Sequence, residues 1–504
     1  MINSEDNPIL MGIDGGTGGM RVGLYDKTGN CLSFASEEYK TDFPRPGWAM
    51  QDPNDWWHAL KAAVGKALEK GQIRPEQISA LACDTTCTSV VVCRKDGTPL
   101  YPCIIWMDVR AGKEADELLE KTGEFYSPEW MPPKLAWLKR NEKEIYDNAE
   151  VFCEYQDWLT FRLTDKWCMN NNTACNWGYS IKDGFSKKIY EALDIADALD
   201  KFPTENVYRV GEQIGTLSET AAGYFGLPEG LPIAQGGIDS SIGLLGIGVN
   251  CSGRIGMITG SSNLAMALNE RPLLNPDGSN NGPDNLIAGY YTDYVAQSAS
   301  GSILSWFRKQ FCPDRSYKEL DELAKEIPIG SNGLLLLDYF QGNKHPYHDS
   351  KVKGMFYGLS LAHTKADMYR AILEGVAFGS ERILDTFREN GVDVKEMNIA
   401  GGSARSDLWM QIHADVSDIV INVPKDINAP NLGCAIACAV MLKIYPSLKD
   451  AVDHMVKYER SYYPDQKNHE KYRKIYELYK DFYPDTKEWM HRFSDVFEEI
   501  EKES

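Results

Sequence analysis

Long apolar runs are absent from this sequence of 504 residues, and none approaches the ~20 residues that a membrane-spanning helix needs. A signal peptide is also missing, because Met1–Pro8 is polar and acidic, so we expect a cytoplasmic protein without a membrane partner. Positive charge is scarce, and the formal net charge of -20 argues against a nucleic-acid partner, because phosphate backbones are bound by basic surfaces. An anionic ligand would therefore depend on local backbone N–H groups, a few cationic side chains and a divalent cation.

Paired cysteine spacing is lacking as well. None of the twelve cysteines forms a Cys-x-x-Cys pair, and the eight histidines lie at no recognised ligand spacing from them. We therefore expect reduced thiols and no zinc site. The chain is instead long enough, with 43% hydrophobic residues, to exceed a single core, so two domains with an active site between them are expected.

A strand, a glycine-rich turn and a second strand occur twice in the chain. Ile9–Asp14 reads as a strand that breaks at Gly15–Gly19 and resumes as Arg21–Tyr25, which predicts a hairpin. The segment Gly253–Leu268 repeats this pattern around Gly260-Ser261-Ser262. The repetition suggests a duplicated architecture.

Alternating strand and helix patterns in both halves favour two α/β domains. The expected helices include 56–70, 132–141, 365–390, 407–416 and 431–442, and the expected strands include 78–82, 90–93, 397–400 and 419–423. We place the domain boundary in the glycine-rich patch Gly246–Gly253, which gives domains of residues 1–248 and 249–504. The second would end in a helical tail from about Tyr458.

The first glycine-rich turn is a candidate phosphate site. Four glycines within five residues let backbone N–H groups face an anion at close range, and Arg21 adds a cation. Asp14 at the strand end is placed to hold hydrated Mg²⁺. The candidate phosphate ligands are Gly16, Thr17, Gly18, Gly19 and Arg21. The turn matches neither the G-x-x-x-x-G-K-[ST] loop nor the dinucleotide fingerprint, and an ordinary tight hairpin is the alternative.

Two further motifs follow apolar strands. Asp239, in the run Gly236-Gly237-Ile238-Asp239, heads a small-residue segment and is either a helix N-cap or a carboxylate that projects into a cleft. At Gly401-Gly402, followed by Arg405, paired glycines would let an adenosine group approach the backbone, or would form a plain strand-to-helix connection.

In this order, the motifs resemble the FGGY family of carbohydrate kinases, closest to its ribulokinase and xylulokinase-like members. The resemblance covers almost the whole chain and implies two duplicated actin-like (ribonuclease-H-like) α/β domains with a cleft between them. Asp14–Thr17 looks like the family's first phosphate motif, Gly260–Ser262 like its second and Gly401-Gly402 like its adenosine motif. Gly47–Pro53 is similar to the sugar-side G-W-x-x-Q-D-P stretch, and Asp239 looks like the catalytic aspartate, with Asp14 and Asp239 near the metal.

Within the family, Asp84–Thr88 and Asp338–Pro346 resemble the ribulokinase branch, and Trp106–Ala111 also fits it. The sugar-binding residues implied by the resemblance are Gln51, Asp84, Cys87, Thr88, Trp106, Asp108, Arg110 and Asp239. The chain departs from the family at Gly18-Gly19, where hydroxyl residues are common, and at Pro430-Asn431, where an acidic or small residue is usual.

The resemblance implies a kinase that transfers phosphate from ATP, with Mg²⁺, to a hydroxyl of a small sugar, most simply ribulose or xylulose. A kinase of a polyol such as erythritol or glycerol, an actin-like ATPase and a silent sugar-binding regulator are the alternatives. The small sugar is the expected partner, and the family allows a homodimer. The exact sugar and the hydroxyl attacked do not follow from the residues.

Overall fold

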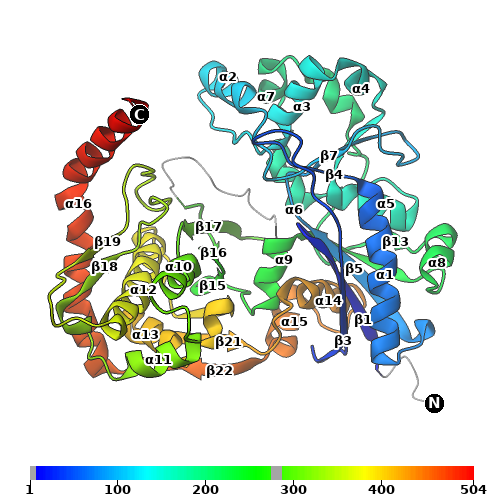
Figure 1. Cartoon of the computed structure of the whole chain (residues 1–504). Helices are drawn as coiled ribbons and strands as arrows, with labels where there is room; N and C mark the ends of the chain where they lie inside the picture. The colour runs from blue at the N-terminus through cyan, green and yellow to red at the C-terminus, as the bar shows by residue number, and fades with distance from the viewer. Residues whose placement is uncertain (1–6, 274–285, 504) are drawn as a thin grey trace. The chain divides into compact units, whose positions relative to one another are not determined.

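The computed structural model describes residues 7–273 and 286–503, which divide into two compact units (Figure 1). Unit 1 comprises residues 7–250, 270–273, 286–292 and Asn428–Lys457, and unit 2 comprises Cys251–Asn269, Asp293–Ile427 and 458–503. The units are therefore not divided at one point near residue 248, because the late segment Asn428–Lys457 folds with the first half of the chain. The cleft between two domains stays a prediction.

Unit 1 is built on a six-stranded sheet in the order β13-β14-β5-β1-β2-β3. The strands are β1 (Ile9–Gly16), β2 (Gly19–Tyr25), β3 (Cys31–Glu38), β5 (Ile78–Thr85), β13 (Gln213–Thr216) and β14 (Pro232–Ile238). β1 and β2 form the predicted antiparallel hairpin, and β1 pairs with β5 in parallel. The register sets Asp14 opposite Arg21 on one side and opposite Asp84 on the other.

Helix α14 (Ala429–Met441) packs on β1, β5 and α9 (Asp239–Gly246) in the core of unit 1. A Cβ atom on Gly12 would lie 2.0 Å from the carbonyl oxygen of Asn431, so only glycine lets this helix lie directly on β1. The Asn431 side chain donates to the carbonyl oxygens of Gly12 (2.9 Å) and Arg21 (3.1 Å). The family departure at Asn431 thus fastens α14 to the first hairpin.

A second sheet of unit 1, in the order β4-β7-β6-β8, carries the loops of the predicted sugar side. Its strands are β4 (Met50–Gln51), β6 (Val90–Cys93), β7 (Cys103–Ile104) and β8 (Val151–Glu154). The remaining elements of unit 1 are α1 (Pro53–Gly71), α2 (Gly112–Thr122), α3 (Met131–Asn141), α4 (Lys143–Asn148), α5 (Tyr155–Thr164), β9 (Met169–Asn170), α6 (Asn171–Ala174), β10 (Tyr179–Ser180), β11 (Gly184–Phe185), α7 (Lys187–Ala192), β12 (Val207–Tyr208), α8 (Glu219–Phe225) and α15 (Leu448–Met455).

The sheet of unit 2 has the order β17-β16-β15-β20-β21-β22. It repeats the first sheet when that sheet is read from β3 to β13, so that β15 and β16 correspond to β1 and β2. Its strands are β15 (Arg254–Thr259), β16 (Asn263–Asn269), β17 (Tyr291–Gln297), β20 (Glu396–Gly401), β21 (Val420–Pro424) and β22 (Tyr458–Tyr462). β15 and β16 form the second predicted hairpin around Gly260–Ser262, and two parallel pairings followed by an antiparallel one complete the sheet. Both units share this sequence of pairings, so the predicted duplication is confirmed.

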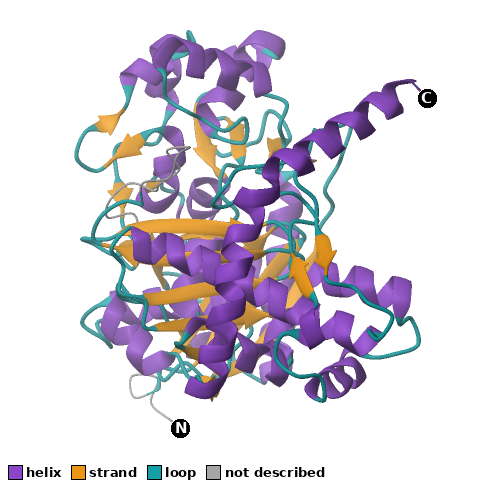
Figure 2. Cartoon of the chain, turned by 90° about the vertical axis from the view of Figure 1, so that its left-hand side faces the viewer, coloured by secondary structure: helices purple, strands orange, loops and turns teal. Residues whose placement is uncertain are grey.

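The helices of unit 2 cover its sheet (Figure 2). They are α10 (Gly301–Phe311), α11 (Tyr317–Lys325), α12 (Lys365–Glu389), α13 (Asp407–Ser417) and α16 (Gln466–Glu503), and a small ribbon is formed by β18 (Leu335–Leu337) and β19 (Met355–Tyr357). The expected helical tail begins with an edge strand, β22, before α16. No helix within the described ranges combines the length and apolarity needed to cross a membrane.

Candidate active site

The turn of the first hairpin consists of Thr17 and Gly18, and Gly18 is exposed. The Thr17 hydroxyl accepts a hydrogen bond from Trp106 Nε1 (2.9 Å), and the Thr17 carbonyl oxygen accepts one from Gln51 Nε2 (2.7 Å). Gln51 Oε1 in turn accepts from Trp56 Nε1 (2.9 Å). Three predicted site residues, Thr17, Gln51 and Trp106, are thus brought together, with Gln51 supporting the turn.

Two carboxyl groups lie side by side below this turn. Asp14 and Asp84 are buried register partners on β1 and β5, and their carboxyl groups interact. Asp14 Oδ2 pairs with Arg21 Nη1 at 2.6 Å, whereas Asp84 Oδ2 accepts from Cys434 Sγ at 3.1 Å. Oδ1 of each aspartate is buried without a donor among the described residues. Burial therefore raises the pKa of both groups, although Arg21 opposes the rise.

Arg21 keeps 42% of its side chain exposed despite the ion pair, so guanidinium donors remain available to an anion. The guanidinium lies close to Gly16, where an added Cβ would be 2.5 Å from Arg21 Nη1, and the exposed Gly18 is in the turn of the same hairpin. Both observations fit the predicted phosphate site at this turn. Asp84 was expected to contact the sugar, but its side chain is wholly buried beside Asp14.

Asp239 is half-buried at the first turn of α9, directly after β14. Its Oδ1 accepts a hydrogen bond from the backbone N–H of Ser240 at 2.6 Å. Desolvation, followed by the negative charge of Asp14, raises the pKa of Asp239 to about 7. A carboxylate with such a pKa exchanges protons near neutral pH, as a general base does.

The loop between β5 and β6 carries Cys87 and Thr88, and a buried glutamate and a buried lysine each bind its backbone. Glu154 Oε1 and Oε2 accept the backbone N–H groups of Thr88 and Ser89, each at 3.0 Å. Lys134 Nζ donates to the carbonyl oxygens of Thr88 (2.7 Å) and Ile105 (2.8 Å). Burial raises the pKa of Glu154 and lowers that of Lys134, in each case to about 8. Glu154 and Lys134 thus fix two predicted sugar loops, and our sequence reasoning missed both residues.

Thr88 has a backbone φ of 53°, in the left-handed region that a β-branched residue rarely adopts. Its hydroxyl forms no hydrogen bond within the described parts of the chain, although the residue is largely buried. A strained residue with an unused hydroxyl, held in place by buried partners, is typical of a ligand-contacting position. Neighbouring Cys87 is half-buried, and burial raises the pKa of its thiol.

Asp108 and Arg110 pair with each other. Asp108 Oδ2 accepts from Arg110 Nη2 and from the Ala49 backbone N–H, both at 2.6 Å, and Oδ1 accepts from Arg110 Nε at 2.8 Å. The Arg110 guanidinium lies 3.7 Å from the centre of the Trp48 ring and 4.8 Å from that of Trp137. These contacts use both carboxylate oxygens within the protein, and they do not support direct sugar contact by Asp108.

The second hairpin opens onto a pocket of about 890 Å³ that lies within unit 2. Four predicted nucleotide residues line it, namely Gly260, Ser261, Gly402 and Arg405. Ser262 does not line the pocket, but its carbonyl oxygen accepts the Gly260 N–H at 2.9 Å. Gly401 does not line the pocket either. It has a φ of 118°, and an added Cβ would be 2.0 Å from the Thr259 carbonyl oxygen. The volume fits a cofactor-sized ligand.

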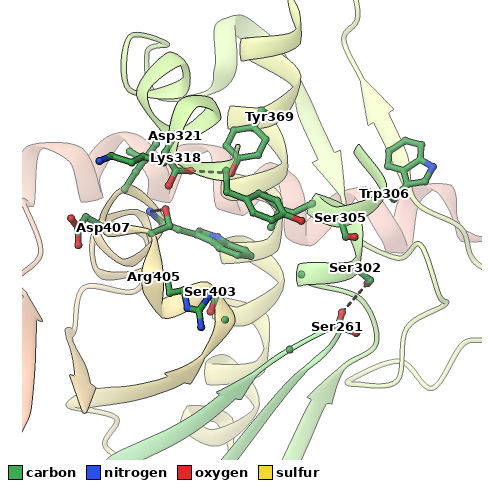
Figure 3. A pocket seen from close by; sticks show the side chains of 18 of the residues that line it. Ser261, Ser302, Ser305, Trp306, Lys318, Asp321, Tyr369, Ser403, Arg405 and Asp407 are labelled. Atoms are coloured by element: carbon green, nitrogen blue, oxygen red, sulfur yellow. Dashed lines mark hydrogen bonds between the residues drawn. The ribbon is translucent and has the colours of Figure 1, made fainter. Parts of the chain in front are cut away.

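One side of the pocket is polar (Figure 3). Ser302, in the first turn of α10, donates from its hydroxyl and its N–H to the Ser261 carbonyl oxygen, at 2.8 Å and 3.2 Å. The N-terminus of α10 is therefore held against the second glycine turn, and the N–H groups of Gly301 and Ser302 are bonded to the carbonyl oxygens of Gly260 and Ser261.

The other side of the pocket is aromatic. Tyr369 and Trp409 line it, and the Tyr369 hydroxyl donates to Asp321 Oδ1 at 2.9 Å (Figure 3). Burial raises the pKa of Asp321. Sequence reasoning missed this wall, because its residues come from α11, α12 and α13 without a motif; only the helical spacing of buried aromatics could have indicated it.

No group of three or more His, Cys, Asp or Glu side chains has a metal-binding arrangement in residues 7–273 and 286–503. Mg²⁺ is commonly bound by only one or two carboxylates together with water and phosphate oxygens. The donor-free Oδ1 of Asp14 fits such an ion.

Two family models match the chain. The N-terminal domain of the FGGY family of carbohydrate kinases matches residues 9–246, and the C-terminal domain of that family matches residues 256–442. A xylulose kinase of Staphylococcus epidermidis is 26% identical over 487 residues, covering 95% of this chain and 97% of its own. A ribulokinase of Bacillus licheniformis is 29% identical over 517 residues, covering 91% and 93%.

The fold is also that of a solved xylulose kinase from Lactobacillus acidophilus, with a TM-score of 0.85 and 22% identity over 96% of this chain and 100% of that one. A gluconate kinase from the same organism has the same TM-score and identity, and covers 95% and 98%. The family models together cover most of the chain. The chain therefore belongs to the FGGY family of carbohydrate kinases and is a phosphotransferase with an alcohol group as acceptor.

Proposed function

We propose that this kinase transfers the γ-phosphate of ATP to a hydroxyl of a ketopentose, ribulose or xylulose. Asp239 carries the proposal, because a half-buried carboxylate with a pKa of about 7 is suited to accept the proton of an attacking hydroxyl. Its pKa responds to Asp14 and Arg21, so the candidate base and the first hairpin belong to one electrostatic cluster.

The first hairpin would hold the transferred phosphate. The backbone around Thr17 and Gly18 and the half-exposed Arg21 offer donors to phosphate oxygens. Asp14, assisted by Asp239, would hold Mg²⁺, which when bound neutralises charge on the phosphates. Phosphoryl transfer requires mainly positioning and charge neutralisation, and these residues supply both.

The pocket of unit 2 is the proposed ATP site. Its aromatic wall of Tyr369 and Trp409 suits a purine ring, and the polar side around Ser261 suits phosphate. Gly402 supports this assignment, because no heavy atom lies within 4 Å of the position that its Cβ would take. The backbone there is open to a ligand.

Ribulose is the substrate that we favour over D-xylulose. The support is the likeness of Asp84–Thr88 and Asp338–Pro346 to the ribulokinase branch, together with the ribulokinase and xylulose kinase relatives. Thr88 offers an unused hydroxyl to a sugar hydroxyl, and a site built on hydrogen bonds rejects analogues that lack a partner.

The test is ADP release with D- and L-ribulose, D-xylulose, erythritol and glycerol, each with and without Mg²⁺. We expect the highest kcat/KM with a ribulose and little ADP without sugar, and Asp239→Asn serves as the inactive control. A best rate with erythritol or glycerol would replace the ketopentose by a polyol. Sugar-independent ADP release that survives in Asp239→Asn would indicate an ATPase instead.

A further inference from the structure

The strand that leads to Asp239 contains a bulge. β14 keeps its parallel register with β5 up to Gln235 and resumes it at Ile238, one residue out of step. The two glycines in between, Gly236 and Gly237, therefore lie opposite a single residue of β5. Bulges are frequent beside active sites, where they redirect the side chain that follows. Here the side chain that follows the strand is that of Asp239, the candidate base.

Two buried asparagine side chains bind the backbone of this bulge. Asn170 Nδ2 donates to the carbonyl oxygen of Gly236 at 2.9 Å. Asn172 Oδ1 accepts the backbone N–H of Ile238 at 2.7 Å. The two bonds lie on either side of Gly237, so the bulge is held before and after its second glycine. We call Asn170 and Asn172 the asparagine clamp.

Close neighbours explain why both positions of the bulge are glycine. A Cβ atom on Gly236 would lie 1.9 Å from the carbonyl oxygen of Cys83. A Cβ atom on Gly237 would lie 2.5 Å from Asn172 Oδ1. The clamp thus occupies the space that a side chain at residue 237 would need. The glycine pair before the candidate base is therefore matched to the asparagine that binds the next backbone N–H.

The asparagine clamp is also connected to the loop between β5 and β6, which carries Thr88 and is called the sugar loop below. Asn170 Oδ1 accepts the Asn172 N–H at 2.7 Å, and the Asn170 N–H is donated to Asp157 Oδ1 at 2.9 Å. Asp157 Oδ2 accepts the Glu154 N–H at 3.3 Å, and the Glu154 carboxylate binds the loop itself. One buried chain of hydrogen bonds thus joins the sugar loop to the backbone in front of the candidate base.

We propose that Asn172, as part of the asparagine clamp, is a positioning residue that holds Asp239 at a fixed place relative to the sugar loop. It acts through the backbone of Ile238, the residue directly before the base. A general base must lie within hydrogen-bond reach of the proton that it accepts, so a small displacement lowers the rate more than it lowers binding. The inference rests on the proposed role of Asp239 as the base and is independent of which sugar is used.

Asn172→Leu tests the clamp in the full-length enzyme by steady-state kinetics, with circular dichroism to confirm folding. Leucine has nearly the shape of asparagine but no acceptor, so the buried Ile238 N–H loses its partner. We expect kcat to fall roughly 5- to 150-fold, with the KM for ATP nearly unchanged and the KM for sugar changed less than kcat. Asn172→Asp should recover most of the loss, because it keeps the acceptor, and Asn172 Nδ2 has no acceptor to lose among the described residues.

Asn422→Leu is the matched control. Asn422 is also buried, and its Oδ1 likewise accepts one bond, from Ser461 Oγ at 2.7 Å, but it lies on β21 of unit 2. This variant should have a lower thermal unfolding midpoint and the native kcat. Losses of kcat that follow the loss of stability equally in Asn422→Leu and Asn172→Leu would reduce the clamp to a structural role and overturn the proposal.

Gly237→Ala tests the same contact from the other side. Its Cβ would displace Asn172 Oδ1, so kcat should fall, and the loss should be smaller when Asn172→Ala has vacated the space. Equal losses in both backgrounds would overturn the proposal, as would a folded Asn172→Leu enzyme with native kcat while Asp239→Asn is inactive. If Asp239→Asn is itself as active as the native enzyme, the proposed base is wrong, and the clamp proposal is overturned with it.

Discussion

Replacing Glu154 by glutamine probes the link between the buried scaffold of unit 1 and the sugar loop. Each Glu154 oxygen accepts one backbone N–H of the loop, from Thr88 and from Ser89, and Oε1 also accepts Trp177 Nε1 at 3.2 Å. At about pH 9, above the Glu154 pKa of about 8, the native side chain is ionised and both of its oxygens accept. Glutamine keeps the shape, but its NH₂ group must face one of these donors. One buried donor of the loop then loses its acceptor.

The size of the effect follows from that single unpaired group. A buried donor without a partner costs about 1–3 kcal/mol. Thr88 already adopts the left-handed conformation, which is unfavourable for threonine, so the loop can relax by leaving its native geometry. If that free energy must be restored when sugar binds, the KM for sugar rises roughly 5- to 150-fold, since each 1.4 kcal/mol is a factor of ten. The KM for ATP and the kcat at saturating sugar should change little.

Steady-state kinetics at about pH 9, where Glu154 is ionised, with each substrate varied in turn provide the assay, and circular dichroism confirms folding. Glu150→Gln is the matched control, because Glu150 also accepts one backbone N–H, from Lys95 at 2.9 Å, but at the surface. Its kinetic constants should match those of the native enzyme. An unchanged sugar KM in a folded Glu154→Gln variant, or an equal rise in the ATP KM, would refute the positioning role.

The remaining predictions concern the chemistry, the stability and the nucleotide. Asp239→Asn should lower kcat by ~10²–10⁴-fold with little change in sugar affinity, as measured by turnover and by sugar titration. The pKa of Asp239 in the folded protein is about 7, above the usual 3.8. The logarithm of kcat/KM for sugar should therefore rise with pH at slope one up to about pH 7 and then level off. A flat profile from about pH 5 to 8 would contradict the role of Asp239 as the base. The same shift makes the native protein lose stability relative to Asp239→Asn as pH rises from about 4 to 7, so the variant should unfold at the higher temperature at pH 8 but not at pH 4. Gly402→Val should raise the KM for ATP more than the KM for sugar, without loss of stability, because its Cβ meets open space. Gly401→Ala should instead lower the thermal unfolding midpoint, because Gly401 has a φ of 118°. A selective rise in the KM for sugar in Gly402→Val would place the nucleotide elsewhere.

The hairpins and their glycine turns could be predicted from the sequence because their signals are local. A strand of apolar residues that ends in several glycines has few alternatives, and both hairpins formed where the pattern placed them. Helix α12, expected over residues 365–390, runs from Lys365 to Glu389 for the same reason. The return of Asn428–Lys457 to unit 1 had no such signal, because it depends on packing between α14 and β1.

Long-range partners of charged residues were beyond the sequence. Lys134 and Glu154 lie in otherwise apolar segments, and their roles depend on which backbone groups the fold brings to them. The family resemblance implied Asp84 as a sugar-binding residue, and the parallel register of β1 and β5 sets it against Asp14. Only the strand pairing reveals that two carboxyl groups share one buried position.

The duplicated sheets also explain why acid–base chemistry is expected in unit 1 alone. In the first hairpin, the position two pairs before the turn holds Asp14 opposite Arg21, with Asp84 on the parallel neighbour. The equivalent position of the second hairpin holds Met257 opposite Ala265, with Ile399 on the parallel neighbour. The same backbone frame thus presents carboxylates and a cation in one unit and only apolar side chains in the other. Since phosphoryl transfer needs one base and one charge-neutralising cluster, the second copy was free to keep its turn for ligand binding and to bury the rest as core.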